Sequence, residues 1–488
     1  MRVLLLDLDS TSPDHLGCYG YERDTSPNLD RLAEQGVRFT NYFTSDAPCM
    51  PSRTALMSGQ FGIHNGVVNH GGRAGDPRQE GEDREFVARL TDECFPALFR
   101  AEGMHTALVS PFGERHSAWH FYAGFNEIHN TGARGGESAE QVTPVVLDWL
   151  ERNARRDDWM LYVNYWDPHT PYRAPEEFGN PFEDEPLPGW MTDETIARHR
   201  AKTGPHSMRE INMYDSREQP EYPRQPGEIR DRDDLKRMID GYDCGIRYMD
   251  GHIGQIFETL ERLGAMDDTI VVVTADHGEN MGQLGIYGEH GTADRGTCRI
   301  PMIIRWPGMR QGHVDHGLHY HLDLPPTFAD LLGRPAPKSW DGQSYAPALK
   351  SGEDSGRSYL VISQCAHVCQ RSVRFGRWLY MRTYHDGYHL FDRDMLFDLE
   401  ADPYEQRNIA SSHPELCREG MYLLAEWHDD MMKSMPYPCD TDPLWTVMSE
   451  GGPYHARGHL PRYIERLKAT GRAEAAEELA RRHPREFE

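Results

Sequence analysis

The chain has 488 residues, and its 52 basic and 78 acidic side chains give a net charge of −26 at pH 7. This length favours two domains or one large α/β domain with a smaller one, and a hydrophobic content of 38% is enough to build their cores. A charge of −26 repels phosphate backbones and anionic lipid heads, which excludes a general binder of nucleic acid or membrane surfaces. An anionic substrate would therefore need a local cationic pocket.

The start of the chain and its cysteines indicate the compartment. The apolar stretch in Met1–Asp7 is too short for a signal peptide, and no later run reaches the ~20 apolar residues that span a bilayer. The nine cysteines are scattered without a small-scaffold spacing, as expected for free thiols in a reducing compartment. These features predict a cytoplasmic protein.

Short apolar runs that end abruptly in polar residues predict four buried parallel strands. A helix between the first two has Ser26 as a candidate N-cap and Gly36 at its end, and a second helix is predicted around Tyr248–Leu263. Strands that alternate with helices are typical of a doubly wound α/β core. The four predicted strands are Val3–Leu8, His105–Val109, Trp159–Trp166 and Thr269–Thr274.

Polar residues follow each of these strands. In open α/β sheets, ligands bind beyond the carboxyl ends of the strands, so residues at these ends are expected to meet in one site. They are Asp9, Glu114-Arg115-His116, Asp167-Pro168-His169 and Asp276-His277.

The rest of the chain divides into three regions. Residues 173–232 are polar, rich in proline and without periodicity, which predicts an irregular insertion that either shapes the substrate site or forms plain surface. A strand such as Ser372–Arg382 indicates a smaller antiparallel-sheet domain, and Leu460–His483 reads as one or two charged amphipathic helices. We expect this tail to pack on another subunit of a homo-oligomer, with packing on its own chain as the alternative. The predicted domains are 1–345, 346–440 and 441–488.

The segment Cys49–Gly59 carries the most specific local signal. Pro51 suits the first turn of a helix, which would place Cys49 at its N-terminus, where free N–H groups favour an anion, with the charge of Arg53 nearby. Taken alone, such a cysteine is more often a small buried apolar residue.

The wider pattern resembles the sulfatase family, whose signature Cys-x-Pro-x-Arg matches Cys49–Arg53. The resemblance implies an alkaline phosphatase-like fold, a mixed sheet flanked by helices, and a maturation enzyme that oxidises Cys49 to formylglycine. Further stretches follow in family order: Asp9–Gly20, Thr25–Asp30, Thr274–Glu279, Gly288–Gly291, Ile300–Gly308 and Leu396–Pro403.

A metal site is expected from the residues and from the resemblance. Asp9 and Asp276, each just past a central strand, would repel each other in a cleft unless a cation lies between them. The resemblance adds His277 and the modified Cys49 as ligands of one divalent ion. Ser10 stands where many sulfatases have a second carboxylate, so it joins the candidate ligands. Ca²⁺ is slightly favoured, with Mn²⁺ or Mg²⁺ as alternatives.

Two histidines are expected to act on the substrate. The resemblance assigns to His169 a contact with the ester oxygens or the proton for the leaving group. The family's Gly-Lys-Trp-His element is absent after the second strand, so we assign its histidine role to His116 and its charge to Arg115.

Three other residues complete the expected substrate site. Arg53 would offset charge on the sulfate oxygens. His290 is expected to approach the site, and Arg295 to supply a cation that a family lysine usually provides.

Another short motif has the spacing of a metal clip. Cys365-x-His367-x-Cys369 lies in a predicted strand without a second ligand pair, so buried thiols are predicted there.

The resemblance predicts hydrolysis of sulfate monoesters. A hydroxyl of hydrated formylglycine would attack sulfur and expel the alcohol, and the second hydroxyl would then release sulfate. The expected substrate is a small sulfate ester or a sulfated glycan fragment. The alternatives are a phosphonate monoester or phosphodiester hydrolase on the same scaffold, and a non-catalytic binding protein in which Cys49 stays a thiol.

Overall fold

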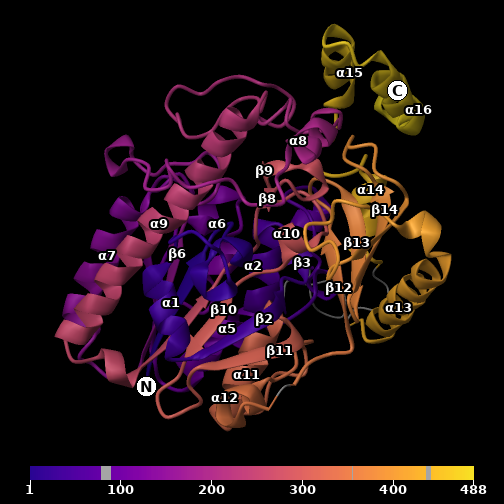
Figure 1. Ribbon diagram of the computed structural model, residues 1–488. Helices are drawn as coiled ribbons and strands as arrows, with labels where there is room; N and C mark the ends of the chain where they lie inside the picture. Colours follow the sequence, from indigo (N-terminus) through magenta and orange to yellow (C-terminus); the bar gives the residue numbers. More distant parts are fainter. Residues whose placement is uncertain (79–88, 354, 436–440, 488) are drawn as a thin grey trace.

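A large mixed sheet forms the centre of the molecule (Figure 1). The structure is a computed structural model that describes residues 1–78, 89–353, 355–435 and 441–487. All neighbouring strand pairs of this sheet are parallel except those of β10, which runs antiparallel to β7 and β2. In spatial order the strands are β11 (His313–Tyr320), β2 (Val37–Phe43), β10 (Met302–Arg305), β7 (Thr269–Thr274), β1 (Arg2–Leu8), β6 (Trp159–Tyr165), β4 (His105–Val109) and β5 (Glu127–His129).

Helices cover both faces of this sheet because its central strands are apolar on both sides. Leu4 and Leu6 of β1 pack into the core formed with α1, α7 and α9, whereas Val3 and Leu5 face the core formed with α2, α5, α11 and α12. The first set is α1 (Pro27–Glu34), α7 (Ala139–Asn153) and α9 (Arg232–Arg262), and the second is α2 (Cys49–Ser58), α5 (Phe95–Ala101), α11 (Leu324–Leu331) and α12 (Ala346–Ser351).

The predicted doubly wound α/β core is thus confirmed, and the four predicted strands correspond to β1, β4, β6 and β7. Two helix predictions need correction. Helix α9 begins at Arg232, well before the predicted Tyr248. Ser26 precedes α1 but does not cap it with its side chain, because its hydroxyl accepts from Gly17 N and donates to Asp30.

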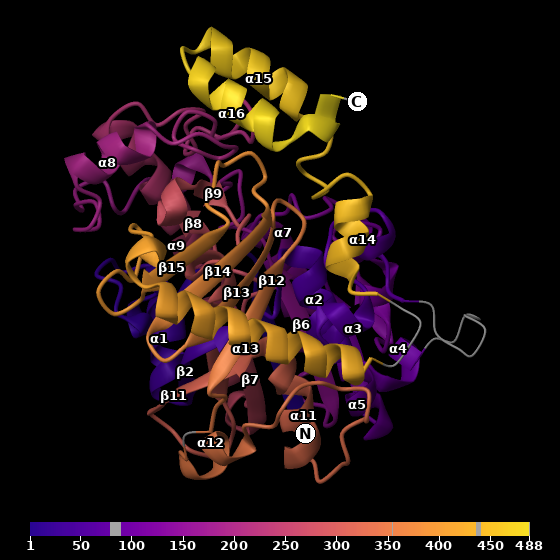
Figure 2. The same cartoon turned by 90° about the vertical axis from the view of Figure 1, so that its right-hand side faces the viewer.

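A second, smaller sheet has the order β15-β14-β13-β12-β3. The predicted strand Ser372–Arg382 is in fact the hairpin of β13 (Cys369–Phe375) and β14 (Trp378–His385). Helix α13 (Pro414–Lys433) covers one face of this sheet (Figure 2). The remaining strands are β12 (Tyr359–Gln364), β15 (Asp394–Asp398) and β3 (Asp46–Ala47).

Strand β3 joins the two parts of the molecule. It pairs in parallel with β12, although it lies in the sequence just before Cys49. The smaller sheet is therefore antiparallel as predicted except at this edge, and its edge strand leads directly into the helix that carries Cys49.

The insertion 173–232 is largely irregular, as predicted, apart from α8 (Asp193–Arg200) and a short 3-10 helix at Glu176–Phe178. The remaining short elements are α3 (Gly62–Asn65), α4 (Arg89–Glu93), α6 (Phe112–Arg115), α10 (Arg295–Cys298), β8 (Asn280–Met281) and β9 (Tyr287–Glu289).

The tail consists of α14 (Pro443–Ser449), α15 (Leu460–Ala469) and α16 (Ala473–Arg482), which confirms its amphipathic helices. It packs on the insertion of its own chain: Tyr463 Oη accepts from Gly204 N at 2.9 Å, and Arg466 and Arg472 both pair with Glu210. Figure 2 shows α15 and α16 above the insertion. This is the alternative to the subunit contact expected from the sequence; an oligomer through the tail stays a prediction.

The cysteines and the helices bear on the predicted compartment of the protein. The eight cysteines in the described residues are free thiols, and Cys439 lies outside the described residues. Within the described part of the chain, no helix combines the length and apolar character needed to cross a membrane.

Helix α9 backs the loop that follows β6, and this packing can be tested with two glycines of the same helix. A Cβ at Gly245 would lie 2.8 Å from the carbonyl oxygen of Asp167, whereas a Cβ at Gly251 would meet nothing within 4 Å. Alanine gains roughly 1 kcal/mol of helix propensity at either site, but the clash at Gly245 costs about 1–3 kcal/mol. We expect Gly245→Ala to lower Tm and Gly251→Ala to leave it equal or higher, measured by thermal unfolding. Equal shifts in both variants would contradict this packing.

Candidate active site

Four strand ends converge on one buried site, as the sequence predicts. Ligand atoms of Asp9, Cys49, Asp276 and His277 all lie within 4.8 Å of one another. Asp9 follows β1 and its N–H donates to Tyr165 O of β6, while Asp276 and His277 follow β7. Because β6 and β7 both flank β1, the fold brings these carboxylates together at the carboxyl edge of the sheet.

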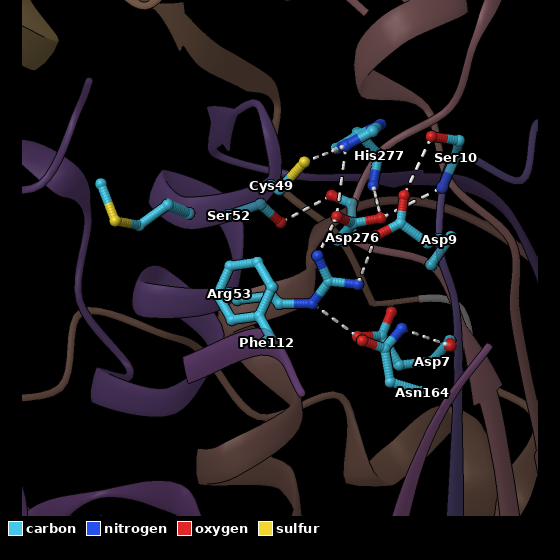
Figure 3. Close-up of polar contacts among 12 residues, drawn as sticks. Asp7, Asp9, Ser10, Cys49, Ser52, Arg53, Phe112, Asn164, Asp276 and His277 are labelled. Carbon is cyan, nitrogen blue, oxygen red and sulfur yellow. Dashed lines mark hydrogen bonds and ion pairs between the residues drawn. The ribbon is translucent and has the colours of Figure 1, made fainter. Parts of the chain in front are cut away.

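Arg53 lies among three carboxylates beneath this group (Figure 3). Its Nε donates to Asp7 Oδ2 at 2.9 Å, its Nη2 donates to Asp9 Oδ2 at 2.9 Å, and its Nη1 donates to Asp276. The guanidinium packs under Phe112, with 4.4 Å from Cζ to the ring centroid, and Arg53 is 1% exposed. Three of the five N–H donors of Arg53 are thus engaged by carboxylates, and its expected contact with substrate oxygens stays a prediction.

Three carboxylates surround the single positive charge of Arg53. Burial raises the pKa of Asp7 to about 6, and burial together with the charge of Asp9 raises the pKa of Asp276 to about 7. Burial acts in the same direction on Asp9, but the charge of Arg53 outweighs it and lowers the pKa of that carboxyl. Asp9 thus keeps its charge, while Asp276 holds a proton part of the time at neutral pH.

These donors fit a divalent cation. Carboxylate oxygens of Asp9 and Asp276 converge with His277, and a cation would replace the proton on Asp276. His277 Nδ1 donates to Gly278 O at 2.9 Å, which leaves Nε2 as the free lone pair, the tautomer that a metal ligand needs.

Ser10 supports Asp9 by a hydrogen bond. Its hydroxyl donates to Asp9 Oδ1 at 3.0 Å, and its N–H donates to Asp276 Oδ1 at 3.3 Å. Its φ of 58° is in the left-handed region, which turns the chain sharply after Asp9. Ser10 therefore touches the candidate ligands Asp9 and Asp276 through hydrogen bonds.

Cys49 begins helix α2, as its sequence predicts, and its Sγ lies 3.1 Å from His277 Nε2. Burial and the charges of Asp9 and Asp276 raise the pKa of this thiol well above its usual value. The helix N-terminus does not overcome these effects. The unmodified residue is therefore a neutral thiol at physiological pH and a poor nucleophile.

Arg115 and His169 form a pair beside Cys49. Arg115 Nη2 donates to His169 Nε2 at 2.9 Å, and His169 Nδ1 donates to Thr170 O. Burial and the charge of Arg115 lower the pKa of His169 to about 3. In this structure His169 Nε2 accepts from Arg115, and the expected contact of His169 with the ester oxygens or the leaving group stays a prediction. The positive charge of the pair belongs to Arg115.

His116 lies next to Cys49 as expected, and the structure adds His70, which the sequence reasoning missed. The two rings stack with centroids 4.2 Å apart, and a nitrogen of each lies within 4.8 Å of Cys49 Sγ. His116 Nε2 has no hydrogen-bond partner among the described residues. Burial and the charge of Arg115 lower the pKa of His116 to about 3.

His290 approaches the site as expected, since its ring stacks on His277 at 3.9 Å. Its nitrogens lie 3.0 Å from Glu279 and 3.2 Å from Glu289. Burial and the charge of Glu289 raise the pKa of Glu279 well above its usual value. His290 is therefore held by two glutamates rather than left free to donate to a substrate.

Arg295 does not reach this group of side chains. Its guanidinium donates to both oxygens of Asp14, at 2.7 and 3.0 Å, and to Pro403 O. Its expected place in the substrate site is corrected, because Asp14 follows the β1 end by several residues and draws this arginine into a separate ion pair. Arg299 donates to the same carboxylate.

Four site residues were missed from the sequence: Asp7, His70, Glu279 and Glu289. Asp7 carried a usable signal, an acid inside an otherwise apolar strand. Such an acid is rarely buried without a charged partner. His70 and Glu279 lie on connections and Glu289 ends the short strand β9, and the positions of all three follow from long-range topology.

Comparison with known proteins identifies the relatives of this chain. The sequence model of the family described as Sulfatase matches residues 2–334, and that of the N-sulphoglucosamine sulphohydrolase C-terminal region matches residues 288–419. The choline-sulfatase of Rhizobium meliloti (strain 1021) is 28% identical over 426 residues, which span 79% of this chain and 78% of that protein.

Solved structures share the fold. BT4656, in complex with its substrate D-glucosamine-2-N,6-O-disulfate, has a TM-score of 0.70 at 19% identity and is matched over 89% of this chain and 99% of its own. The phosphonate monoester hydrolase of Agrobacterium radiobacter has a TM-score of 0.68 at 20% identity, over 88% of this chain and 95% of its own.

The central role of Arg53 predicts a large effect of its removal. Arg53→Met leaves the carboxylates of Asp7, Asp9 and Asp276 buried without their cation, and loss of one partner of a buried ion pair costs about 3–5 kcal/mol. We expect a marked fall in Tm in the presence of EDTA. Arg53→Lys keeps the charge but not the donor geometry toward three carboxylates, so its Tm should lie between those of wild type and Arg53→Met. An unchanged Tm of Arg53→Met would contradict this view.

The loop after β6 contains a second buried acid, Asp167, whose effect depends on pH. Its Oδ1 accepts from Ala139 N at 2.8 Å, its Oδ2 has no partner among the described residues, and burial raises its pKa to about 7. The unfolded state releases this proton near pH 4, so the stability that Asp167 contributes falls as the pH rises from about 4 to 7. Asp167→Asn should match the wild-type Tm near pH 4 and exceed it at pH 8.

The control is Asp148→Asn, on the exposed surface of helix α7, where the carboxylate pairs with Arg152 and its replacement should give no gain in Tm at pH 8. A Tm difference of Asp167→Asn that stays constant from pH 4 to 8 would show that Asp167 is charged throughout.

Proposed function

This chain belongs to the sulfatase family and is a sulfuric ester hydrolase of alkaline phosphatase-like fold, and from this premise we propose that Cys49, oxidised to formylglycine, is its nucleophile. The observation that carries the proposal is the group of Asp9, Cys49, Asp276 and His277, with ligand atoms within 4.8 Å. The raised thiol pKa of Cys49 supports the need for the modification, because an unmodified residue there is not ionised. A formylglycine-generating maturation enzyme is the partner that this proposal requires.

We assign one divalent ion to Asp9, Asp276 and His277, with position 49 as a further ligand. Ca²⁺ is our choice because two carboxylates dominate the donor set, and the imidazole of His277 keeps Mn²⁺ as the main alternative, with Mg²⁺ behind it. When bound, the ion polarises a sulfate oxygen and favours the ionised form of the nucleophilic hydroxyl. Ser10 orients the Asp9 carboxylate by its hydrogen bond.

Other side chains of this chain position the ligands or balance the charge of the substrate. Arg53 holds Asp7, Asp9 and Asp276 in place and is a positioning residue. Arg115, oriented by His169, supplies the positive charge that balances the sulfate oxygens as negative charge redistributes.

We assign to His116 the contact with the leaving alcohol oxygen. Its Nε2 has no hydrogen-bond partner among the described residues, and its ring lies beside position 49. An N–H at this position can donate to the alcohol oxygen as the S–O bond breaks. His290 lines the pocket through its stacking on His277.

The substrate class proposed is a small sulfate ester or a sulfated glycan fragment. Support comes from BT4656, whose substrate is D-glucosamine-2-N,6-O-disulfate. The free cysteines are consistent with the predicted cytoplasmic location, which stays part of this proposal.

A second candidate is a phosphonate monoester or phosphodiester hydrolase. The Asp276–His277 pair and the absence of the family lysine element after β4 favour it, and a phosphonate monoester hydrolase is among the structural neighbours. Both candidates use the same nucleophile and differ in the group that is attacked.

Three measurements test this proposal. Mass spectrometry of the peptide that contains Cys49, from protein purified from its native host, should show the aldehyde or its hydrate. Steady-state kcat/KM should be higher for an aryl sulfate than for a phosphonate monoester or a phosphodiester. Cys49→Ala should lose at least about 10⁴-fold in kcat.

Cys49→Ser serves as the control for packing, since it keeps a small polar side chain without the aldehyde. A purely thiol peptide would sink the formylglycine mechanism, and a sulfate ester that is the slowest substrate by orders of magnitude would select the phosphonate or phosphodiester candidate.

A further inference from the structure

Three histidines far apart in the sequence meet beside the nucleophile. One ring nitrogen each of His70, His367 and His455 lie within 4.8 Å of one another. His70 comes from the loop after α3, His367 from the β12–β13 connection, and His455 from the tail. Of the motif Cys365-x-His367-x-Cys369, only His367 belongs to this cluster. Cys365 and Cys369 are buried thiols, as predicted.

Contacts from the same segments fix the positions of these rings. His455 Nε2 and His70 Nδ1 are 2.9 Å apart, and the rings of His455 and His367 stack at 4.1 Å. The backbone N–H of His455 donates to Ala366 O at 2.9 Å, so the tail is anchored to the β12–β13 connection. These contacts hold the three rings in one cluster.

The three rings are electrically neutral and lie near a carboxylate. Burial, together with neighbouring histidines, lowers the pKa of all three. His367 Nε2 lies 3.7 Å from Glu289, whose charge is also shared with His206 and His290. Neutral imidazoles with a nearby carboxylate are the form in which histidines bind metals. Because His70 Nδ1 and His455 Nε2 share a hydrogen bond, one of them carries a proton, and this proton moves to the other nitrogen of its ring when an ion binds both.

We propose that His70, His367 and His455 form a second metal site, specific for a zinc-like transition-metal ion and separate from the Asp9–Asp276 site. Nitrogen ligands of tetrahedral Zn²⁺ lie about 2.0–2.1 Å from the ion and so about 3.3 Å from one another. The observed separations, 2.9 Å for one pair and at most 4.8 Å for the others, bracket this value. To direct their lone pairs at one ion, the stacked rings of His367 and His455 have to rotate out of their stack.

Ligand chemistry separates the two sites. The Asp9–Asp276 site is dominated by carboxylate oxygens, which suit hard ions, whereas three imidazoles suit Zn²⁺, Co²⁺ or Ni²⁺ and bind Ca²⁺ poorly. Three protein ligands leave a fourth position for water or a substrate atom. His70 also belongs to the group with Cys49 and His116, so an ion held here lies on the border of the substrate pocket.

The test is zinc binding by the full chain in the presence of excess Ca²⁺, with Zn²⁺ measured by isothermal titration and by elemental analysis after dialysis. We expect wild type to bind one equivalent of Zn²⁺ more than His367→Ala or His455→Ala. Cobalt-loaded wild type should show visible absorption bands of a nitrogen-ligated ion, which both variants lose.

The matched control is His459→Ala, in the same tail segment but stacked on Tyr214 and outside the cluster. It should bind zinc as wild type does. The titration is repeated in Cys49→Ala, which cannot form formylglycine, so that the result does not depend on the proposed nucleophile. Wild type without the additional equivalent, or His367→Ala and His455→Ala with as much zinc as wild type, would overturn the proposal. Conservation of Tm verifies that the variants fold, and if either His367→Ala or His455→Ala does not fold, the other variant decides the outcome.

Discussion

The ion-pair network of Arg53 with Asp7, Asp9 and Asp276 is the constraint on which the active site depends. Two of these acids end β1 and the third follows β7, so one guanidinium fixes two neighbouring strand ends relative to helix α2. A lysine would supply a single point charge, whereas the planar guanidinium offers donors in the directions of all three carboxylates. The geometry of position 49 is therefore set by a charge cluster below it, which leaves the substrate side of the pocket to other residues.

This division explains how a protein with a net charge of −26 can act on an anion. The buried acids around Arg53 attract a divalent ion rather than the substrate, and the ion would reverse the sign of the potential at the nucleophile. Arg115, placed by its hydrogen bond to His169, adds a cation on the pocket side. Negative charge on the rest of the surface then has little influence, because screening limits it to about 10 Å at ordinary ionic strength.

The smaller sheet and the tail contribute to the same pocket. Strand β3 extends that sheet into the segment that carries Cys49, the β12–β13 connection supplies His367, and the tail supplies His455. Packing of α15 on the insertion of the same chain keeps the tail in place through Tyr463 and Arg466. Parts that look like separate additions in the sequence thus contribute side chains near Cys49.

The sequence by itself determined four adjacent parallel strands of the large sheet, β7, β1, β6 and β4, and the residues at their carboxyl ends. Uninterrupted apolar runs predict buried parallel strands, and parallel strands end at one edge, so Asp9, His169, Asp276 and His277 could be placed together from their positions alone. Tertiary structure decided the partners of those residues. Arg53 turned out to bind carboxylates, Arg295 paired with Asp14, and His70 and His455 joined the pocket. Periodicity records which face of an element is buried, but it carries no information about which distant polar group a long side chain or a loop residue will meet.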